Sequence, residues 1–345
     1  MDLKKYFIFI IVCMLLSKQK RLSNKQKKIV NLAFATNNNG VKLLYISLFS
    51  LLENSNNNTI YNIYIQVKNN FEKELKVLLH NLEKIYFNCF LHFINMKREF
   101  INAFRNHLDI STYYRIKLPI LCSNINRIVH IDADTLILKD LLELYTLNFE
   151  QKFILGRLDG ITDELDKLGV ITKNYINAGI ILMDLYSFRK YNYDKKFMNY
   201  INNHNNYRYL WHHAQTTINF ICHDKIGLLK PRYHMWPFIS KKDLIDLNNL
   251  FRIKYNETEF LNDYDNPFIV HYPGVYKDFT KNSTYNRLYK EYLAKIKGNE
   301  IEQVIKNTLY VINCLSFGIF ILIKLIIIYR KYFYKKRYIE KKYCF

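Results

Sequence analysis

Two aspartates stand two positions apart in an otherwise apolar, β-branched run that reads IVHIDADTLIL over residues 128–138. In an extended segment the side chains of residues i and i+2 point to the same side, so we expect Asp132 and Asp134 to converge. Two carboxylates held close together repel each other, and one takes up a proton unless a cation lies between them. A divalent ion that prefers oxygen ligands, Mg²⁺ or Mn²⁺, would remove this conflict. The spacing therefore indicates a metal site.

Two other interpretations of the same residues stay open at this point. The aspartates could be solvated side chains in a turn at the end of a strand. A strand followed by D-x-D-x-T is also the nucleophile loop of haloacid-dehalogenase-like phosphatases, where Asp132 would accept the phosphoryl group and Asp134 would be the general acid. That loop normally follows the first strand of its domain, whereas residues 29–122 already show a βαβ pattern here. A convincing downstream lysine and acidic pair is also missing.

The segments around the aspartates predict an α/β sheet that would place them at one edge. Strand-like runs at 29–36, 60–67 and 86–94 alternate with helix-like runs at 41–54 and 71–85, and a helix is expected at 113–122. This alternation is typical of βαβ units and a mostly parallel sheet. Ligands of such sheets bind beyond the carboxyl ends of the strands. We therefore expect the turn NNNG at 37–40 to share an edge with the aspartates.

Length, charge and cysteine spacing limit the class of protein. The 345 residues fit one domain of about 250 residues with appendages. The chain has 51 Lys and Arg but 30 Asp and Glu, which gives a net charge of +21. This positive charge allows nucleic acid, anionic lipid or phosphate-bearing substrates as partners. No nucleic-acid-binding motif is recognisable, so we expect no nucleic acid partner. The six cysteines include no C-x-x-C pair, which argues against a zinc ribbon or a disulfide scaffold.

Apolar segments lie near both ends of the chain. The first, at 6–16, is shorter than the roughly 20 residues that span a bilayer. The second, at 308–329, is long enough and contains one charge, Lys324. The tail at 330–345 mixes basic with aromatic residues, a composition that suits anionic headgroups. The C-terminus is therefore expected to contact a membrane.

A set of motifs in collinear order resembles glycosyltransferase family 8. They are NLAFATNNNG (31–40), STYYRIKLP (111–119), RIVHIDADTLILKDL (127–141), NYINAGIILMDLYSFRK (174–190) and HYPGVYKDF (271–279). The resemblance implies a GT-A fold, a Rossmann-like, mixed and mostly parallel sheet with flanking helices. It also implies a retaining, nucleotide-sugar-dependent enzyme related to lipopolysaccharide galactosyl- and glucosyltransferases and to glycogenin.

The resemblance assigns roles to particular residues. It implies that Mn²⁺ or Mg²⁺ is held against the donor diphosphate by Asp132, Asp134 and His271. It implies donor contacts from Ala35, Asn37, Asn39, Arg115, Asp132, Gly274 and Lys277. It places three catalytic or sugar-facing residues at Asp159, Asn177 and Gln215. A neutral imidazole beside carboxylates suits the mixed nitrogen and oxygen ligands that Mn²⁺ accepts.

The sequence also departs from the family pattern. Asn37 and Asn38 stand where aspartates usually contact the uracil, although an amide oxygen can still accept from its N–H. Gln215 remains in place, but Ala214 and Thr216 occupy the acidic positions beside it. These changes raise a second hypothesis, a glycosyltransferase-like protein that has lost turnover and only binds nucleotide or membrane.

The expected organisation has five parts: a basic leader with a short apolar segment (1–28), a catalytic domain (29–282), a helical connector (283–307), a membrane-associated or transmembrane helix (308–329) and a basic aromatic tail (330–345). The expected reaction moves glucose or galactose from a UDP-sugar to a membrane-associated glycan or glycolipid, as in lipopolysaccharide or surface-polysaccharide synthesis. Nucleotide sugars are cytosolic, so the enzyme is expected at the cytoplasmic face. A single span would send the basic tail outside, which favours an interfacial helix.

Overall fold

The computed structural model describes residues 27–68, 71–97, 99–100, 102–104, 108–159, 174–203, 205–206, 210, 212–237, 242, 255–274 and 283–298. The chain divides into two compact units, Met1–Arg287 and Leu288–Phe345. Several predictions fall outside the described residues: the leader before residue 27, the apolar segment 308–329, the tail 330–345 and Lys277. These remain predictions from the sequence.

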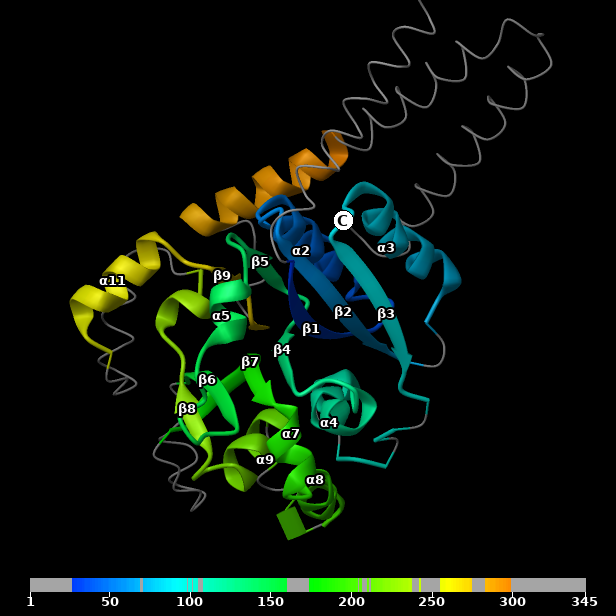
Figure 1. Ribbon diagram of the computed structural model, residues 1–345, viewed down its shortest axis with the longest axis vertical. Coiled ribbons are helices and arrows are strands. Elements are labelled where there is room, and N and C mark those ends of the chain that lie inside the picture. The colour runs from blue at the N-terminus through cyan, green and yellow to red at the C-terminus, as the bar shows by residue number, and fades with distance from the viewer. Residues whose placement is uncertain are drawn as a thin grey trace, which may run out of the picture. The chain divides into compact units, whose positions relative to one another are not determined.

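A seven-stranded sheet forms the centre of the first unit, with the order β3-β2-β1-β4-β7-β6-β8 (Figure 1). Its strands are β1 (Lys28–Thr36), β2 (Thr59–Val67), β3 (Cys89–Asn95), β4 (Arg127–Ile131), β6 (Ile154–Leu158), β7 (Ile176–Asp184) and β8 (Ile226–Leu228). The four strands from β3 to β4 run parallel to one another, whereas β7 is antiparallel to both of its neighbours. The predicted mixed, mostly parallel sheet is confirmed.

A second, two-stranded sheet is built from β5 (Thr135–Ile137) and β9 (Ile269–His271), which pair antiparallel. The small sheet matters for the site because β5 follows the two aspartates and β9 ends at a histidine. The run over residues 128–138, treated as one extended segment in the sequence, is two strands. It breaks after Ile131, and its second part joins a different sheet.

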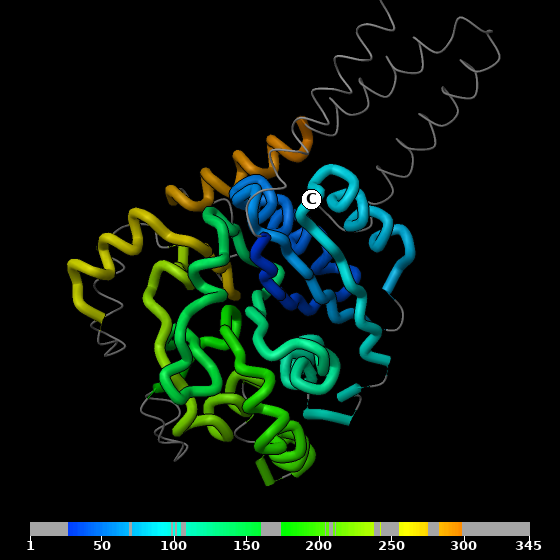
Figure 2. Tube along the Cα trace, in the orientation of Figure 1, coloured from blue at the N-terminus to red at the C-terminus, as the bar shows by residue number. Residues whose placement is uncertain are grey.

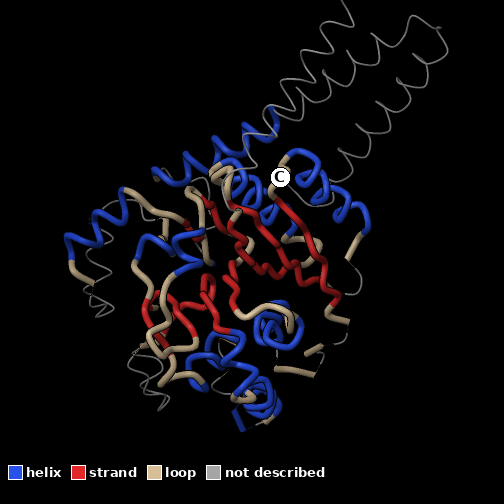
Figure 3. The backbone as a smooth tube through the Cα atoms, in the orientation of Figure 1, coloured by secondary structure: helices blue, strands red, loops and turns tan. Residues whose placement is uncertain are grey.

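Helices flank the strands on both sides (Figure 3). They are α2 (Val41–Glu53), α3 (Lys73–Ile85), α4 (Leu118–Leu121), α5 (Leu142–Thr146), α7 (Leu185–Lys190), α8 (Tyr193–Asn202), α9 (Ala214–Ile221) and α11 (Glu257–Asp265). Short 3₁₀ segments are η1 (Ile110–Lys117) and η3 (Pro231–Tyr233), and a further helix covers residues 284–298. The helix predicted at 113–122 is thus a 3₁₀ segment that continues into α4. In the trace, β1 to β3 alternate with α2 and α3 in the blue-to-cyan half (Figure 2).

Residue patterns explain these elements. In α3, Leu75, Leu79 and Leu82 recur at helical spacing and are buried. Charged residues near both ends of this helix are exposed to solvent. In β1, residues 30–34 are buried without alternation, as expected for a parallel strand covered on both faces. Because β1 and β4 are parallel neighbours, the turn at 37–40 and the aspartates follow the same edge of the sheet, as predicted.

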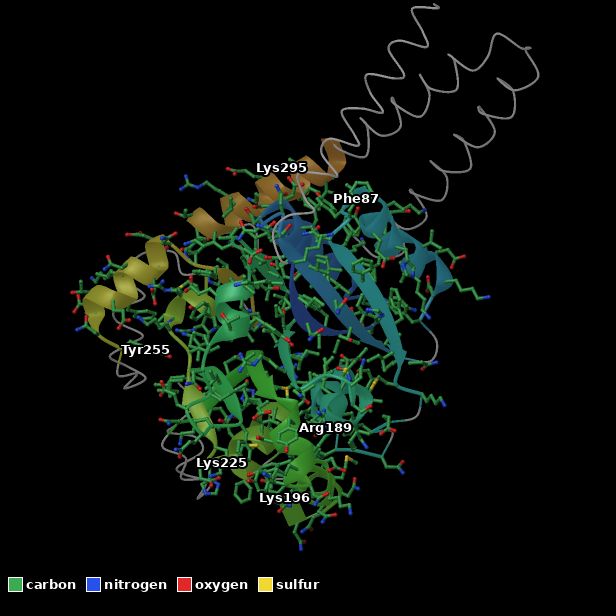
Figure 4. All side chains as sticks on the ribbon, viewed as in Figure 1. Phe87, Arg189, Lys196, Lys225, Tyr255 and Lys295 are labelled. Carbon is green, nitrogen blue, oxygen red and sulfur yellow. The ribbon has the colours of Figure 1, made fainter. Side chains whose placement is uncertain are left out.

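Three basic side chains lie at the edge of the sheet away from the two aspartates. Figure 4 shows Arg189, Lys196 and Lys225 over the part that contains α7, α8 and β8. The ammonium of Lys196 lies 4.2 Å from the ring centre of Tyr193. Because β7 runs antiparallel to β4, the helix α7 that follows it lies at the edge away from Asp132. This part of the positive charge is therefore remote from the predicted metal site.

Two further sequence expectations can be compared with the described residues. The cysteines among them, Cys89, Cys122 and Cys222, are buried free thiols, in agreement with the absence of paired cysteine spacing. Among the described helices, none combines the length and the apolar character that crossing a bilayer requires.

Candidate metal centre and donor site

The two aspartates lie in the link between β4 and β5. The Thr135 hydroxyl donates to the backbone oxygen of Asp132 at 3.0 Å and closes this link into a tight turn. The backbone N–H of Asp132 donates to the oxygen of Gly179 on β7 at 2.7 Å. The expected convergence of Asp132 and Asp134 is present, but a turn produces it rather than an extended strand.

The short strand β9 carries His271 to the same place. His271 pairs with Thr135 in the small sheet, and the next N–H, of Tyr272, donates to the backbone oxygen of Asp134 at 2.9 Å. The His271 Nε2 atom lies 3.3 Å from Asp134 Oδ1 and 3.8 Å from Asp132 Oδ2. One ligand atom from each of the three residues lies within 4.8 Å of the others. We call Asp132, Asp134 and His271 the metal cluster.

The two oxygens of Asp132 have different partners. Its Oδ1 accepts from Arg115 Nη2 at 2.8 Å and from His130 Nε2 at 3.2 Å. Its Oδ2 is the oxygen that faces His271. Burial alone would raise the pKa of the Asp132 carboxyl, but the Arg115 guanidinium and the His130 ring hold that pKa well below its usual range. The carboxylate is therefore ionised and has one oxygen turned toward the cluster.

The ligand types of the cluster and the distances between them fit a divalent ion. Carboxylate oxygens with one imidazole nitrogen are ligands that Mn²⁺ accepts, and Mg²⁺ accepts the oxygens. The cluster also depends on Gly179, because a Cβ there would lie 2.3 Å from His271 Cε1 and displace the ring. Gly179 is therefore needed for the close approach of β7 to His271, a role separate from the sugar contact that the sequence predicted near it.

Arg115 connects the metal cluster to β7. Its side chain is buried and donates through Nη1 to the backbone oxygen of Ala178 and through Nε to the oxygen of Thr112 at 3.0 Å. Because Nη2 donates to Asp132, each of the three guanidinium nitrogens makes a hydrogen bond. The structure therefore gives Arg115 a role in holding a metal-cluster carboxylate, in addition to the donor contact that the resemblance implies.

A second polar group lies at the start of β7. Asp159 Oδ2 accepts from Asn177 Nδ2 and from Gln215 Nε2, both at 2.9 Å. Gln215 Oε1 accepts from the N–H of Ala178 at 3.0 Å, and Asn177 Oδ1 accepts from the N–H of Gly179 at 2.8 Å. We call Asp159, Asn177 and Gln215 the amide network. The three residues predicted as catalytic or sugar-facing thus lie together in the structure.

The position that lacks the family's first acidic residue is closed. Ala214 begins α9, is 1% exposed, and packs in an apolar cluster with Ile176, Ala178 and Ile218. Thr216 is also buried, and its hydroxyl accepts from the N–H of His212 at 3.3 Å. The space beside Gln215 is therefore filled by packing rather than left open.

The loop after β1 shows how the predicted nucleotide contacts are arranged. Asn37 Oδ1 accepts from the N–H of Gly40 at 2.9 Å, which closes the turn. Asn38 Oδ1 accepts from the N–H of Glu72 at 3.2 Å. Ala35 is partly buried at the end of β1, and Asn39 is exposed. Each of these residues lies at the sheet edge that carries the metal cluster.

The donor-contact residues after β9 are only partly described. Gly274 lies three residues beyond His271 and has a φ of +52°, a conformation that glycine adopts without a Cβ penalty. Lys277 falls outside the described residues.

Two buried histidines beside the cluster were not predicted from the sequence. His130 contacts Asp132, and burial, together with the charge of Arg115, lowers the pKa of His130 to about 4. His234 contacts His271 through a 2.8 Å hydrogen bond, and burial, together with the His271 ring, brings its pKa well below the ordinary range. Both rings are therefore neutral. The position of His130 on the strand that leads to the aspartates is a weak sequence signal that it belongs to the site. Nothing in the sequence pointed to His234.

Comparison with known proteins gives consistent results. The sequence profile of Glycosyl transferase family 8 matches residues 31–282. General stress protein A of Bacillus subtilis (strain 168) is 33% identical over 202 residues, which make up 57% of this chain and 69% of that protein.

Two solved structures share the fold. The galactosyltransferase LgtC, in complex with donor and acceptor sugar analogues, has a TM-score of 0.64 and 17% identity over 77% of this chain and 96% of its own. The apo bifunctional glycosyltransferase WbbM has a TM-score of 0.57 and 18% identity over 76% of this chain. The match covers 51% of WbbM, so this chain spans about half of that protein. The likeness to LgtC agrees with the expected GT-A architecture.

Proposed function

This chain belongs to glycosyl transferase family 8 and is a glycosyltransferase, and on that premise we propose that it transfers glucose or galactose from a UDP-sugar with retention of configuration. The acceptor in this proposal is a glycolipid or a surface-polysaccharide precursor. One observation carries the metal-dependent part: Asp132, Asp134 and His271 bring their ligand atoms within 4.8 Å at the edge of the sheet where nucleotides bind.

In the proposed mechanism the metal cluster holds Mn²⁺ or Mg²⁺. When bound, such an ion supplies Lewis-acid stabilisation of the departing diphosphate and a template for it. Arg115 keeps Asp132 ionised and fixes its Oδ1, so that Oδ2 stays turned toward the cluster. His130 donates to the same Oδ1 and adds no charge, because its ring is neutral. These residues act by presetting the ligands.

The amide network is proposed to face the donor sugar. The orientation of Gln215 follows from its partners, since a carboxylate only accepts and a backbone N–H only donates. Its oxygen is therefore engaged with Ala178, and its NH₂ group with Asp159. The bond from the N–H of Ala178 occupies one of the two lone pairs of the Gln215 oxygen and makes that oxygen a weaker nucleophile. We therefore favour attack by the acceptor on the same face as the leaving group over a double displacement through Gln215.

A second candidate function is a protein of this family that binds nucleotide without efficient turnover. The observation that favours it is Ala214, a residue buried in an apolar cluster that supplies no carboxylate beside Gln215. Hydrolysis of the donor separates the two candidates. An enzyme capable of turnover hydrolyses at least one UDP-sugar to UDP in Mn²⁺, and this hydrolysis stops in EDTA. A protein that only binds nucleotide has affinity for UDP but does not hydrolyse the UDP-sugar.

The experiment that tests the main proposal is a screen of UDP-sugars with a membrane extract, read by mass spectrometry. We expect a hexose added to a glycolipid or polysaccharide precursor from UDP-glucose or UDP-galactose, only when Mn²⁺ or Mg²⁺ is present. Transfer that continues unchanged in EDTA would contradict the metal assignment. Transfer of a sugar other than a hexose would contradict the donor assignment.

We also propose that the enzyme works at the cytoplasmic face of a membrane, through an interfacial C-terminal segment. The support is the sequence of residues 308–345, an apolar run followed by a basic aromatic tail. A membrane-impermeant thiol reagent applied to intact cells tests it through Cys344. We expect Cys344 to be protected, and labelling from outside would show that the segment spans.

A further inference from the structure

His234 lies directly behind the metal ligand His271. The Nε2 atom of His234 is 2.8 Å from the Nδ1 atom of His271, and the ring centres are 4.9 Å apart with a tilt of 48°. His234 is 0% and His271 is 2% exposed. A single hydrogen bond therefore joins the two rings inside the protein, on the side of His271 away from the carboxylates.

The main chain fixes this arrangement. Met235 forms a parallel bridge to Val270 of β9. The N–H of Met235 donates to the oxygen of Ile269 at 2.8 Å, and the N–H of His271 donates to the oxygen of Met235 at 2.7 Å. The N–H of His234 donates to the oxygen of Pro231 at 2.9 Å. Because both histidines are anchored by backbone hydrogen bonds, the contact between their rings follows from the fold.

The chemistry of a neutral imidazole then determines the direction of the bond when a metal is bound. A neutral ring carries one N–H and one lone pair. The Nε2 atom of His271 faces both carboxylates, so it is the nitrogen available to a metal. The remaining proton must then lie on Nδ1 and needs an acceptor, and His234 Nε2 stands at hydrogen-bond distance.

We propose that His234 is a positioning residue of the metal site: its Nε2 accepts from His271 Nδ1–H and so selects the tautomer that presents His271 Nε2 to a divalent ion. The inference rests on the proposed function only in requiring that the cluster holds a metal. In this arrangement the proton of His234 lies on Nδ1, which is buried without a hydrogen-bond partner within the described part of the chain. A buried unpaired polar atom calls for an explanation, and the need of His271 for an acceptor supplies one.

The test measures Mn²⁺ affinity in the full-length protein without donor, by the electron paramagnetic resonance signal of free Mn²⁺. His234→Leu removes the acceptor and is expected to weaken Mn²⁺ binding by roughly 10–100-fold, the usual effect of losing a partner behind a ligand. His234→Gln places an amide oxygen near the position of Nε2 and is expected to restore most of the affinity. The control is His213→Leu, the same change at another buried histidine, which contacts Thr112 and Tyr113 instead of a ligand.

Several outcomes separate the possible failures. Thermal unfolding in EDTA shows whether each variant folds, and if His234→Leu does not, His234→Phe takes its place. Histidine ¹⁵N shifts with Mg²⁺ should report the proton of His271 on Nδ1 in the wild type. Unchanged Mn²⁺ affinity in a folded His234→Leu variant overturns the inference while sugar transfer by the wild type still supports the proposed function. A wild type that binds neither Mn²⁺ nor Mg²⁺ and transfers sugar equally well in EDTA overturns both the inference and the metal-dependent part of the proposed function.

Discussion

The metal cluster and the amide network lie at the same edge of the sheet, yet they are built in opposite ways. In the cluster, one ligand atom from each of two carboxylates and a histidine lies within 4.8 Å of the other two. In the amide network, Asp159, Asn177 and Gln215 bond to one another and to backbone N–H groups. Arg115 balances only one of the two carboxylates of the cluster, so the cluster suits a divalent ion, whereas the network is preorganised by the protein alone.

This contrast indicates how the two regions should respond to change. Loss of a residue from the cluster should lower the metal affinity. Loss of a residue from the network should lower the turnover or the stability. Arg115 is the exception, because it donates to Asp132 in the cluster and to Ala178, whose N–H bonds to Gln215.

Asp134→Ala should give the largest effect. It removes an anionic ligand, so Mn²⁺ affinity should fall by more than the roughly 10–100-fold cost of losing a partner behind a ligand. The backbone bond from Tyr272 to residue 134 does not need the side chain, so the fold should persist. Calorimetric titration of Mn²⁺ into each variant measures this, with Asp194→Ala on α8 as the control, and titration of UDP in Mn²⁺ and in EDTA shows whether nucleotide binding depends on the metal. UDP affinity that is equal in Mn²⁺ and EDTA in the wild type would contradict the metal assignment.

Arg115→Lys should affect both regions at once. A lysine keeps the charge but cannot make the three directed bonds of the guanidinium. We expect roughly tenfold weaker Mn²⁺ binding and a free energy of unfolding lower by about 2 kcal/mol, the range for hydrogen bonds to charged groups. Urea unfolding and Mn²⁺ titration measure the two losses. Arg189→Lys, at the opposite sheet edge, is the matched control, and equal behaviour of the two variants would remove the link between the regions.

Ala214→Asp tests whether the missing carboxylate can be restored. Because Ala214 is buried among apolar side chains, we expect an aspartate to lower the free energy of unfolding by about 1–3 kcal/mol without a gain in donor hydrolysis. Ala214→Asn has nearly the same shape without the charge and separates crowding from desolvation. Faster hydrolysis at unchanged stability would instead show that residue 214 faces the donor.

Gln215→Glu should impair turnover and spare metal binding. A carboxylate at Gln215 would lie opposite the Asp159 carboxylate, where the amide now donates. Losing that bond should lower the transfer rate by about tenfold, since a hydrogen bond to a charged group is worth at least about 1.4 kcal/mol. Steady-state transfer and Mn²⁺ titration on one preparation give both quantities. A parallel loss of Mn²⁺ affinity would mean that the two regions are not separate.

Asp109→Asn should give the smallest effect, on the segment that carries Arg115. Burial alone would raise the pKa of Asp109, but the N–H of Ser111 and the charge of Lys68 bring that pKa below its ordinary value. A lowered folded pKa adds stability above the unfolded pKa of about 3.9, and this stability is lost as the pH falls through the folded pKa. The difference in unfolding free energy between wild type and variant should stay below about 1 kcal/mol and shrink from about pH 6 to about pH 3. A difference that grows toward acid would reverse the assigned sign.

The sequence predicted the first half of the sheet and the three members of the metal cluster. Periodicity identified β1 to β3 and their helices, because each element's burial follows its own residue pattern. Asp132 and Asp134 were recognised from their spacing two residues apart, whereas His271 was recognised only because HYPGVYKDF resembles a motif of the family. The break after Ile131 was missed, because β5 pairs with a strand far along the chain. His234 was missed for the same reason, since only the bridge from Met235 to β9 brings it to His271.

The pairing of β5 with β9 has a consequence for the unfolding of the chain. Each strand has three residues, so this ladder alone contributes few hydrogen bonds. Asp134 and His271 lie at one end of this ladder and come from distant parts of the sequence. A bound ion would therefore cross-link these two segments. Cross-linking distant residues removes conformational entropy from the unfolded chain, more so for longer loops. A free-ion concentration of 100 times the dissociation constant would add about 2.7 kcal/mol to stability, so the supply of the ion would set how long this protein survives proteolysis.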